Sequence, residues 1–123
     1  MPSALIIEDN RQMADSLAQM VKILGLDVDI AYGARTGMIK LQQNVPDVIL
    51  LDVNMPGVDG FEVMAYFRRL PQLKDVPVIV VTSDDQPETV KKARDTGVLA
   101  FLVKPAEVGR IEAALKAAGV LPE

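Results

Sequence analysis

The sequence predicts an α/β domain built on a parallel sheet, and three observations carry this prediction. Short apolar runs alternate with segments of helical hydrophobic spacing, the pattern of strands joined by helical crossovers. The run 48–51 is apolar at every position, as in a strand buried on both faces. The segment 27–31 alternates polar and apolar residues, which is typical of an edge strand. Together these patterns favour a doubly wound, flavodoxin-like sheet of five parallel strands in the order 2-1-3-4-5, with five helices.

Two strands and two helices are expected before the central run. An apolar run at 4–7 predicts the first strand, and 27–31 predicts the second. The helix between them is expected to end at Gly25, with a buried face made of Met13, Leu17, Met20, Val21 and Leu24. A second helix opens at Gly33, and its predicted inner face consists of Ala34, Gly37, Met38 and Leu41.

The carboxyl-terminal half repeats the alternation. A third helix is expected from about 61 to 70, with an inner face made of Phe61, Met64, Ala65 and Phe67. The apolar run 78–81 predicts the fourth strand, and 99–103 the fifth. The helix between them, at 87–96, has a thin apolar stripe made of Val90 and Ala93, so we expect it to be the least firmly anchored. The last helix is expected to bury Val108, Ile111, Leu115 and Ala118.

Polar residues end four of the predicted strands. In the order 2-1-3-4-5 the switch point lies between strands one and three, where such folds bind ligands. Glu8 and Asp9 after strand one are therefore expected beside Asp52 after strand three, at a solvent-facing rim. Thr82 and Lys104 follow strands four and five and reach the same edge. Three crowded carboxylates repel one another, so a cation is expected among them.

Composition limits the chemistry further. The chain has 123 residues, which fits one domain spanning 1–123. It has no histidine and no cysteine, which excludes imidazole catalysis, disulfides and thiolate metal sites, and all-oxygen ligands suit Mg²⁺. The formal net charge of −4 argues against nucleic acid as a direct partner. No signal peptide and no apolar run of about 20 residues is present, so we expect a cytoplasmic protein without a membrane partner.

Taken together, these residues resemble the response-regulator receiver domain of two-component signalling, most closely a stand-alone, chemotaxis-regulator-like receiver. The resemblance covers essentially the whole chain and implies a single receiver domain at 1–123. The matching features occur in the family's order and consist of the acidic pair Glu8-Asp9, the aspartate Asp52, the turn 55–60, the hydroxyl of Thr82 and the pair Lys104-Pro105.

The resemblance implies a phosphoacceptor that is not an enzyme beyond self-phosphorylation and slow self-dephosphorylation. Asp52 would be the nucleophile for a phosphoryl group from a histidine kinase or histidine phosphotransfer protein, with Thr82 and Lys104 binding the phosphoryl oxygens. The implied Mg²⁺ ligands are Glu8 through water, Asp9 and Asp52 directly, and the main-chain carbonyl of Asn54.

The resemblance also implies an output surface. Phe101 falls where the family has a rotating aromatic, so Thr82 and Phe101 are the expected switch residues. The surface would be formed by the helix at 87–96, the strand at 99–103 and the last helix. A downstream target protein or a second copy of the chain would bind there.

Each assignment has a simpler alternative. Asp9 or Asn10 is also a good N-cap for the first helix, and an aspartate before a turn, such as Asp52, is common in loops. Thr82 also suits a capping segment, Lys104 a solvated terminus and Phe101 ordinary packing. At the level of function, the alternatives are a receiver-like interaction module independent of phosphorylation, or a receiver cut from a larger DNA-binding regulator. A haloacid-dehalogenase-like phosphatase would need an aspartate where this chain has Asn54.

Overall fold

The computed structural model describes residues 1–122, and its centre is a five-stranded parallel sheet in the order β2-β1-β3-β6-β7. Its strands are β1 (Ser3–Ile7), β2 (Asp27–Ala31), β3 (Val48–Leu51), β6 (Val78–Thr82) and β7 (Ala100–Val103). This is the predicted order, with the alternating strand at an edge, so the predicted fold class is confirmed. Glu123, the last residue of the predicted domain, lies outside the described residues.

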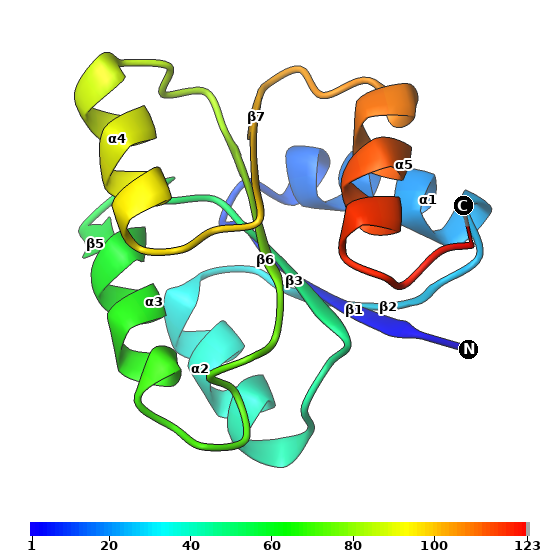
Figure 1. The fold of residues 1–123 in the computed structure, drawn as a ribbon, viewed down its shortest axis with the longest axis horizontal. Coiled ribbons are helices and arrows are strands. Elements are labelled where there is room, and N and C mark those ends of the chain that lie inside the picture. Colours follow the sequence, from blue (N-terminus) through cyan, green and yellow to red (C-terminus); the bar gives the residue numbers. More distant parts are fainter. Residues whose placement is uncertain (123) are drawn as a thin grey trace.

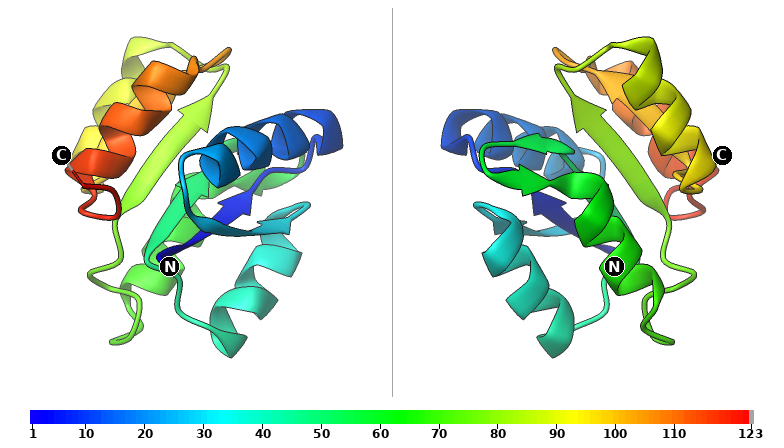
Figure 2. Two further views of the ribbon diagram at one scale, coloured as in Figure 1. Left: turned by 90° about the vertical axis from the view of Figure 1, so that its right-hand side faces the viewer. Right: turned by 90° about the vertical axis from the view of Figure 1, so that its left-hand side faces the viewer.

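Five helices cover the two faces of the sheet. They are α1 (Arg11–Ile23), α2 (Ala34–Gln43), α3 (Gly60–Arg68), α4 (Pro87–Asp95) and α5 (Val108–Ala117). Figure 1 shows α1 and α5 on one face of the sheet and α2, α3 and α4 on the other. The two views in Figure 2 look onto these faces from opposite sides, with α1 and α5 in front in the left view and α3 and α4 in front in the right view. No helix in the described part of the chain is long and apolar enough to cross a membrane.

The central strands supply apolar side chains to both faces, as their unbroken hydrophobicity predicts. Ile6 and Leu50 pack with α1 and α5, whereas Ile7 and Leu51 pack with α2 and α3. All four are at most 1% exposed. Continuous burial of this kind holds the strand ends, and the residues that follow them, in fixed positions.

The expected inner faces of three helices need correction. In α1 the buried residues are Ala14, Ala18 and Val21, and the predicted Met13 is 42% exposed. Small alanines let the helix backbone approach the sheet closely, so the longer side chains of the predicted stripe lie at the flanks of the contact. Ala65 in α3 and Val108 in α5 are also exposed rather than buried. By contrast, α4 has the expected thin inner side, on which only Ala93 is fully buried.

A short antiparallel hairpin follows β3 and was not predicted. It pairs β4 (Asn54–Met55) with β5 (Val58–Asp59). Gly57 lies in the turn with φ of 71°, a conformation that favours glycine. The hairpin leads directly into α3, whose N-cap is Asp59, with the side chain accepting a hydrogen bond from Phe61 N at 2.9 Å.

Arg68 organises the loop between α3 and β6. Its Nη1 donates to the backbone carbonyls of Leu73, Lys74 and Val76 at 3.2, 3.0 and 2.6 Å. Burial lowers the pKa of Arg68 from its ordinary value, yet a guanidinium remains charged at neutral pH. One side chain therefore holds three carbonyls that no strand or helix ladder would satisfy.

We expect Arg68→Met to lower the free energy of unfolding by about 2 kcal/mol, because it keeps the apolar stem and removes charge-assisted hydrogen bonds to three carbonyls. Arg69→Met is the matched control, since the side chain of Arg69 is exposed and its loss should cost less than about 0.5 kcal/mol. Urea unfolding measures both. Equal stability of the two variants would show that Arg68 does not hold this loop.

Candidate functional site

The backbone of the sheet places Glu8 and Asp52 side by side. Ile7 pairs with Leu51 in the parallel register, and Asp52 N donates to Ile7 O at 3.1 Å. On the other side, Glu8 N donates to Ala31 O at 3.1 Å. Glu8 is 3% and Asp52 6% exposed, so these two carboxylates are buried at the rim and the expectation of a solvent-facing position was wrong for them.

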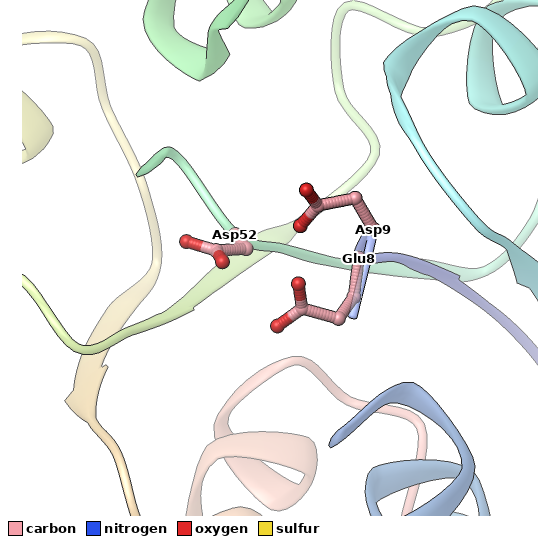
Figure 3. Close-up of side chains that lie close together, drawn as sticks. All are labelled: Glu8, Asp9 and Asp52. Atoms are coloured by element: carbon pink, nitrogen blue, oxygen red, sulfur yellow. The ribbon is translucent and has the colours of Figure 1, made fainter. Parts of the chain in front are cut away.

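Three carboxylates lie close together at this edge. One oxygen from each of Glu8, Asp9 and Asp52 lies within 4.8 Å of the others. Figure 3 shows the carboxyl groups of Glu8 and Asp9 extending toward that of Asp52 from the neighbouring strand end. Asp9 differs from the other two in being exposed to solvent. The cluster therefore has two buried charges and one exposed charge of the same sign.

Lys104 reaches the cluster from the end of β7. Its Nζ donates to Glu8 Oε1 and, at 3.2 Å, to Asp52 Oδ2. Its backbone N donates to Thr82 O at 2.9 Å, which ties the residue to the end of β6. Burial lowers the pKa of Lys104, but the hydrogen bond to Glu8 and the charges of Asp52 and Glu8 outweigh it and raise the pKa above its ordinary value. The ammonium therefore stays charged.

The environment of Glu8 changes the pKa of its carboxyl group. Burial raises its pKa, and the charge of Asp52 acts in the same direction. The hydrogen bonds from Lys104 and from the backbone N–H of Asn10 oppose the rise. On balance the pKa of Glu8 is raised above its ordinary value, with burial as the largest cause.

Asn54 and Thr82 occupy the rest of the rim. Asn54 N donates to Asp52 Oδ1 at 2.9 Å, so the hairpin after β3 orients the aspartate. Thr82 is fully buried at the end of β6, and its Oγ1 lies 3.4 Å from Asp84 N, a long hydrogen bond. The structure thus brings Glu8, Asp9, Asp52 and Lys104 into one cluster and places Thr82 on the same edge. The roles of Thr82 and of the Asn54 carbonyl stay predictions.

Asn10, not Asp9, is the N-cap of α1. Its Oδ1 accepts a hydrogen bond from Met13 N at 3.0 Å. Of the two candidates for this cap, only Asn10 fills the role. The carboxylate of Asp9 lies close to those of Glu8 and Asp52 instead. The simpler reading of Asp9 as a helix cap is wrong.

Phe101 lies on β7 opposite Val80 and packs, partly buried, against the core on the α2, α3 and α4 side.

A separate set of contacts joins α4 to the loop after β3. Lys92 Nζ on α4 lies 3.4 Å from Asp59 Oδ2 and 5.2 Å from the centre of the Phe61 ring. Helix α4 is therefore linked to the segment that follows Asp52 by exposed contacts, each of which is weak.

Met13 is a neighbour of the site that the sequence pattern did not indicate. Its Sδ lies 3.4 Å from Lys104 Nζ, on the wall of a cavity of about 430 Å³. Helical spacing assigned Met13 to the core, because its period matches the stripe on α1. The signal that would have found it is its place in the first turn of a helix that begins at the rim.

The chemistry of this cluster fits a magnesium ion. Its candidate metal ligands are all carboxylate oxygens. One of the three carboxylates, that of Asp9, is exposed to solvent. Mg²⁺ prefers such ligands and keeps several waters when it is bound by one or two protein carboxylates. The Lys104 ammonium supplies a positive charge at the same cluster, so a metal and Lys104 together would balance the three carboxylates.

Comparison with known proteins agrees with this picture. Residues 4–116 match the sequence model of the response regulator receiver domain. The chain is 32% identical over 127 residues to the DNA-binding dual master transcriptional regulator RpaA of Synechocystis sp., a match that covers 100% of this chain and 53% of that protein. It is 34% identical over 117 residues to the transcriptional regulatory protein AfsQ1 of Streptomyces coelicolor, covering 95% of this chain and 51% of the relative. The chain thus spans about half the length of these curated relatives.

Among solved structures, the chemotaxis protein CheY4 of Vibrio cholerae is similar over nearly its whole length. The TM-score is 0.89 at 28% sequence identity, and the match covers 96% of this chain and 98% of that chain. The strand order, the polar residues at the strand ends and the match over residues 4–116 together show that this chain belongs to the response regulator receiver domain family of two-component systems.

Proposed function

We propose that this chain is a phosphoacceptor switch in which Asp52 takes a phosphoryl group from a histidine of a partner sensor kinase or phosphotransfer protein. The observation that supports this most is the position of the Asp52 carboxylate, buried beside Lys104 and within one cluster with Glu8 and Asp9. The chain has no histidine, so the donor acts in trans. Apart from taking up and slowly losing this group, the chain is not an enzyme.

In the transfer, an oxygen of Asp52 attacks the phosphorus atom of the donor. A phosphorus–oxygen bond forms, and the phosphorus–nitrogen bond to the donor histidine breaks. The N–H of Asn54 holds one oxygen of Asp52 and Lys104 the other, which orients the nucleophile before attack. After transfer, Lys104 donates a hydrogen bond to the negatively charged phosphoryl oxygens, and the hydroxyl of Thr82 is the proposed second donor.

The acidic residues would hold the metal for this reaction. We propose Asp9, Asp52 and the main-chain carbonyl of Asn54 as its direct ligands, and Glu8 as a ligand through water. Bound there, Mg²⁺ supplies positive charge that offsets the charge of the phosphoryl oxygens during transfer. Without such a cation, Asp52 and its two acidic neighbours would repel the anionic donor.

Output is proposed to use the surface of α4, β7 and α5. The partner would be a downstream target protein or a second copy of the chain, and the site of action the cytoplasm. Because the chain spans about half of RpaA and AfsQ1, a receiver within a larger DNA-binding regulator is the alternative proposal.

The proposal is tested by incubating the protein with a small-molecule phosphodonor and Mg²⁺ and weighing the intact chain. A stoichiometric acyl phosphate that survives the incubation is the expected result. No mass increase would identify an interaction module independent of phosphorylation. Rapid consumption of the donor without accumulation on the chain would identify a phosphatase instead.

Asp9→Ala is expected to weaken Mg²⁺ binding without disturbing α1, because Asn10 is the cap of that helix. In the wild type, Mg²⁺ at 100 times its dissociation constant should stabilise the fold by about 2.7 kcal/mol. The same concentration should stabilise Asp9→Ala less. Thermal unfolding with and without Mg²⁺ measures this difference. Asp85→Ala, which removes an exposed charge from another loop at this edge, should respond as the wild type does. An equal Mg²⁺ response of Asp9→Ala and wild type would remove Asp9 from the ligand set.

Phosphorylation is expected to turn Phe101 from a mixture of rotamers to a mainly inward one and to remodel the surface around α4. Phe carries no hydroxyl, so packing alone governs the rotation. Only Ala93 anchors α4 fully, which makes this corner easy to rearrange. NMR spectra with Mg²⁺ alone and with Mg²⁺ plus a phosphoryl mimic measure the effect. Shift changes that stay near Asp52 and never reach Val90, Phe101 or Ile111 would exclude output through this surface.

A further inference from the structure

Met13 is the most accessible methionine of the described chain apart from the terminal Met1. Its side chain is 42% exposed, whereas Met55 and Met64 are 4% and 0% exposed. Met20 and Met38 are partly buried in the two cores. Oxidation of a thioether follows its accessibility, so a soluble oxidant reaches Met13 before the other internal methionines.

The sulfur of Met13 also makes a contact that connects it to the proposed reaction. Lys104 Nζ donates to Met13 Sδ at 3.4 Å, and within residues 1–122 this is the one methionine sulfur with a hydrogen bond. A lysine ammonium has three donors. The three donors of Lys104 are directed to Met13, Glu8 and Asp52. If one of these hydrogen bonds becomes stronger, the ammonium moves toward that partner and the other two bonds weaken.

The surroundings of Met13 give a small oxidant room to approach. Met13 lines the cavity of about 430 Å³ that lies between α1 and the segment after β7. The cavity walls are mainly apolar, with contributions from Leu17, Met20, Pro105 and Ala106. Lys104 and Glu8 also line it. Met13 and Lys104 therefore border the same cavity.

We propose that Met13 is an oxidation site at which a peroxide lowers the ability of Asp52 to accept a phosphoryl group. The peroxide transfers one oxygen atom to the sulfur. The oxygen–oxygen bond breaks, a sulfur–oxygen bond forms, the thioether is oxidised by two electrons to the sulfoxide, and hydrogen peroxide is reduced to water. The functional consequence depends on the proposed function, whereas the site of oxidation does not.

The physical basis is competition for Lys104. A thioether is a weak acceptor, while the sulfoxide oxygen carries a large negative partial charge and is bonded to the same sulfur that already accepts from the ammonium. A charge-assisted bond to this oxygen would hold Lys104 toward α1 and weaken its bonds to Asp52 and Glu8. Because Met13 is exposed, oxidation adds a polar group without breaking the core, so the fold is retained.

The experiment treats the protein with hydrogen peroxide and locates the added oxygen by peptide mass mapping. Met13 is expected to be oxidised first among the internal methionines. The 15N resonance of the Lys104 ammonium should shift on oxidation, and phosphorylation by a small-molecule phosphodonor should slow about five-fold, the effect of weakening one charge-assisted hydrogen bond. Methionine sulfoxide reductase should restore both signals.

Two variants separate Met13 from general damage. In Met13→Leu the rate should become insensitive to peroxide, and in Met20→Leu, which changes the same cavity wall, it should remain sensitive. Met13→Gln places an amide oxygen near Lys104 and should resemble the oxidised wild type. Equal oxidation of Met13 and the buried Met64, or an unmoved Lys104 resonance in the Met13 sulfoxide, would overturn the proposal. A protein that takes up no phosphate even before peroxide treatment refutes the proposed function, and the resonance still decides the competition for Lys104.

Discussion

Asp52→Asn is expected to abolish phosphoryl incorporation from a small-molecule donor, with the fold retained. The amide cannot act as the nucleophile, and one negative charge is lost from the cluster with Glu8 and Asp9. Relief of repulsion stabilises the variant, whereas the single amide oxygen can accept from Asn54 N–H or from Lys104 but not from both. These effects offset each other to within about 1 kcal/mol in the free energy of unfolding.

Intact-protein mass measures the incorporation, and urea unfolding measures the stability. Asp59→Asn is the matched control, because it removes a carboxylate from the same loop and asparagine caps α3 as well as aspartate does. This control should be phosphorylated as the wild type is. Phosphate on Asp52→Asn at the wild-type level would show that another residue is the acceptor.

Gly60→Ala is expected to have the second largest effect, on both stability and phosphoryl transfer. A Cβ at this position would lie 2.4 Å from the Cα of Val53, the residue after Asp52. Gly60 N also donates to Val53 O at 3.2 Å, so the first turn of α3 rests directly on this backbone. The overlap involves main chain that no side-chain rotation can move. The free energy of unfolding should fall by about 3 kcal/mol.

Displacement of Val53 also displaces Asp52, so phosphorylation should slow about ten-fold or more even at a temperature where the variant is fully folded. Gly37→Ala is the control. Its Cβ would lie 2.9, 3.0 and 3.2 Å from Cδ1, Cγ1 and Cγ2 of Ile7, which are side-chain and not main-chain atoms, so a smaller loss of stability and an unchanged rate are expected. Thermal unfolding and initial phosphorylation rates distinguish the two variants. A wild-type rate in folded Gly60→Ala would show that contact with Val53 does not position Asp52.

Much of the fold and part of the candidate site could be predicted because both depend on short-range patterns. Unbroken apolar runs identify the central strands, and the polar alternation at 27–31 identifies the edge strand. Parallel strands all end at one edge, so the polar residues after each strand had to meet there. The alternating edge strand favoured the strand order, and the proximity of Glu8, Asp9 and Asp52 followed from that order together with this rule.

Helix faces were predicted less well, since hydrophobic spacing reports a stripe and not its centre. In α1 the sheet is contacted by Ala14 and Ala18, whose small side chains carry little hydrophobic signal, and Met13 is left at the surface. The hairpin at 54–59 was missed because two-residue strands are shorter than any periodic pattern.

By itself, the sequence determined the order of the strands and the chemistry available at their ends, because burial and residue type are properties of each segment. Only the tertiary structure decided how those ends interact. Lys104 binds Glu8 and Asp52 across 96 and 52 positions of the chain, and it meets Met13 across 91. The contact between Gly60 and Val53 depends on the path of a turn. Contacts of this kind arise from the packing of whole elements against one another, where a shift of an ångström decides which side chains meet.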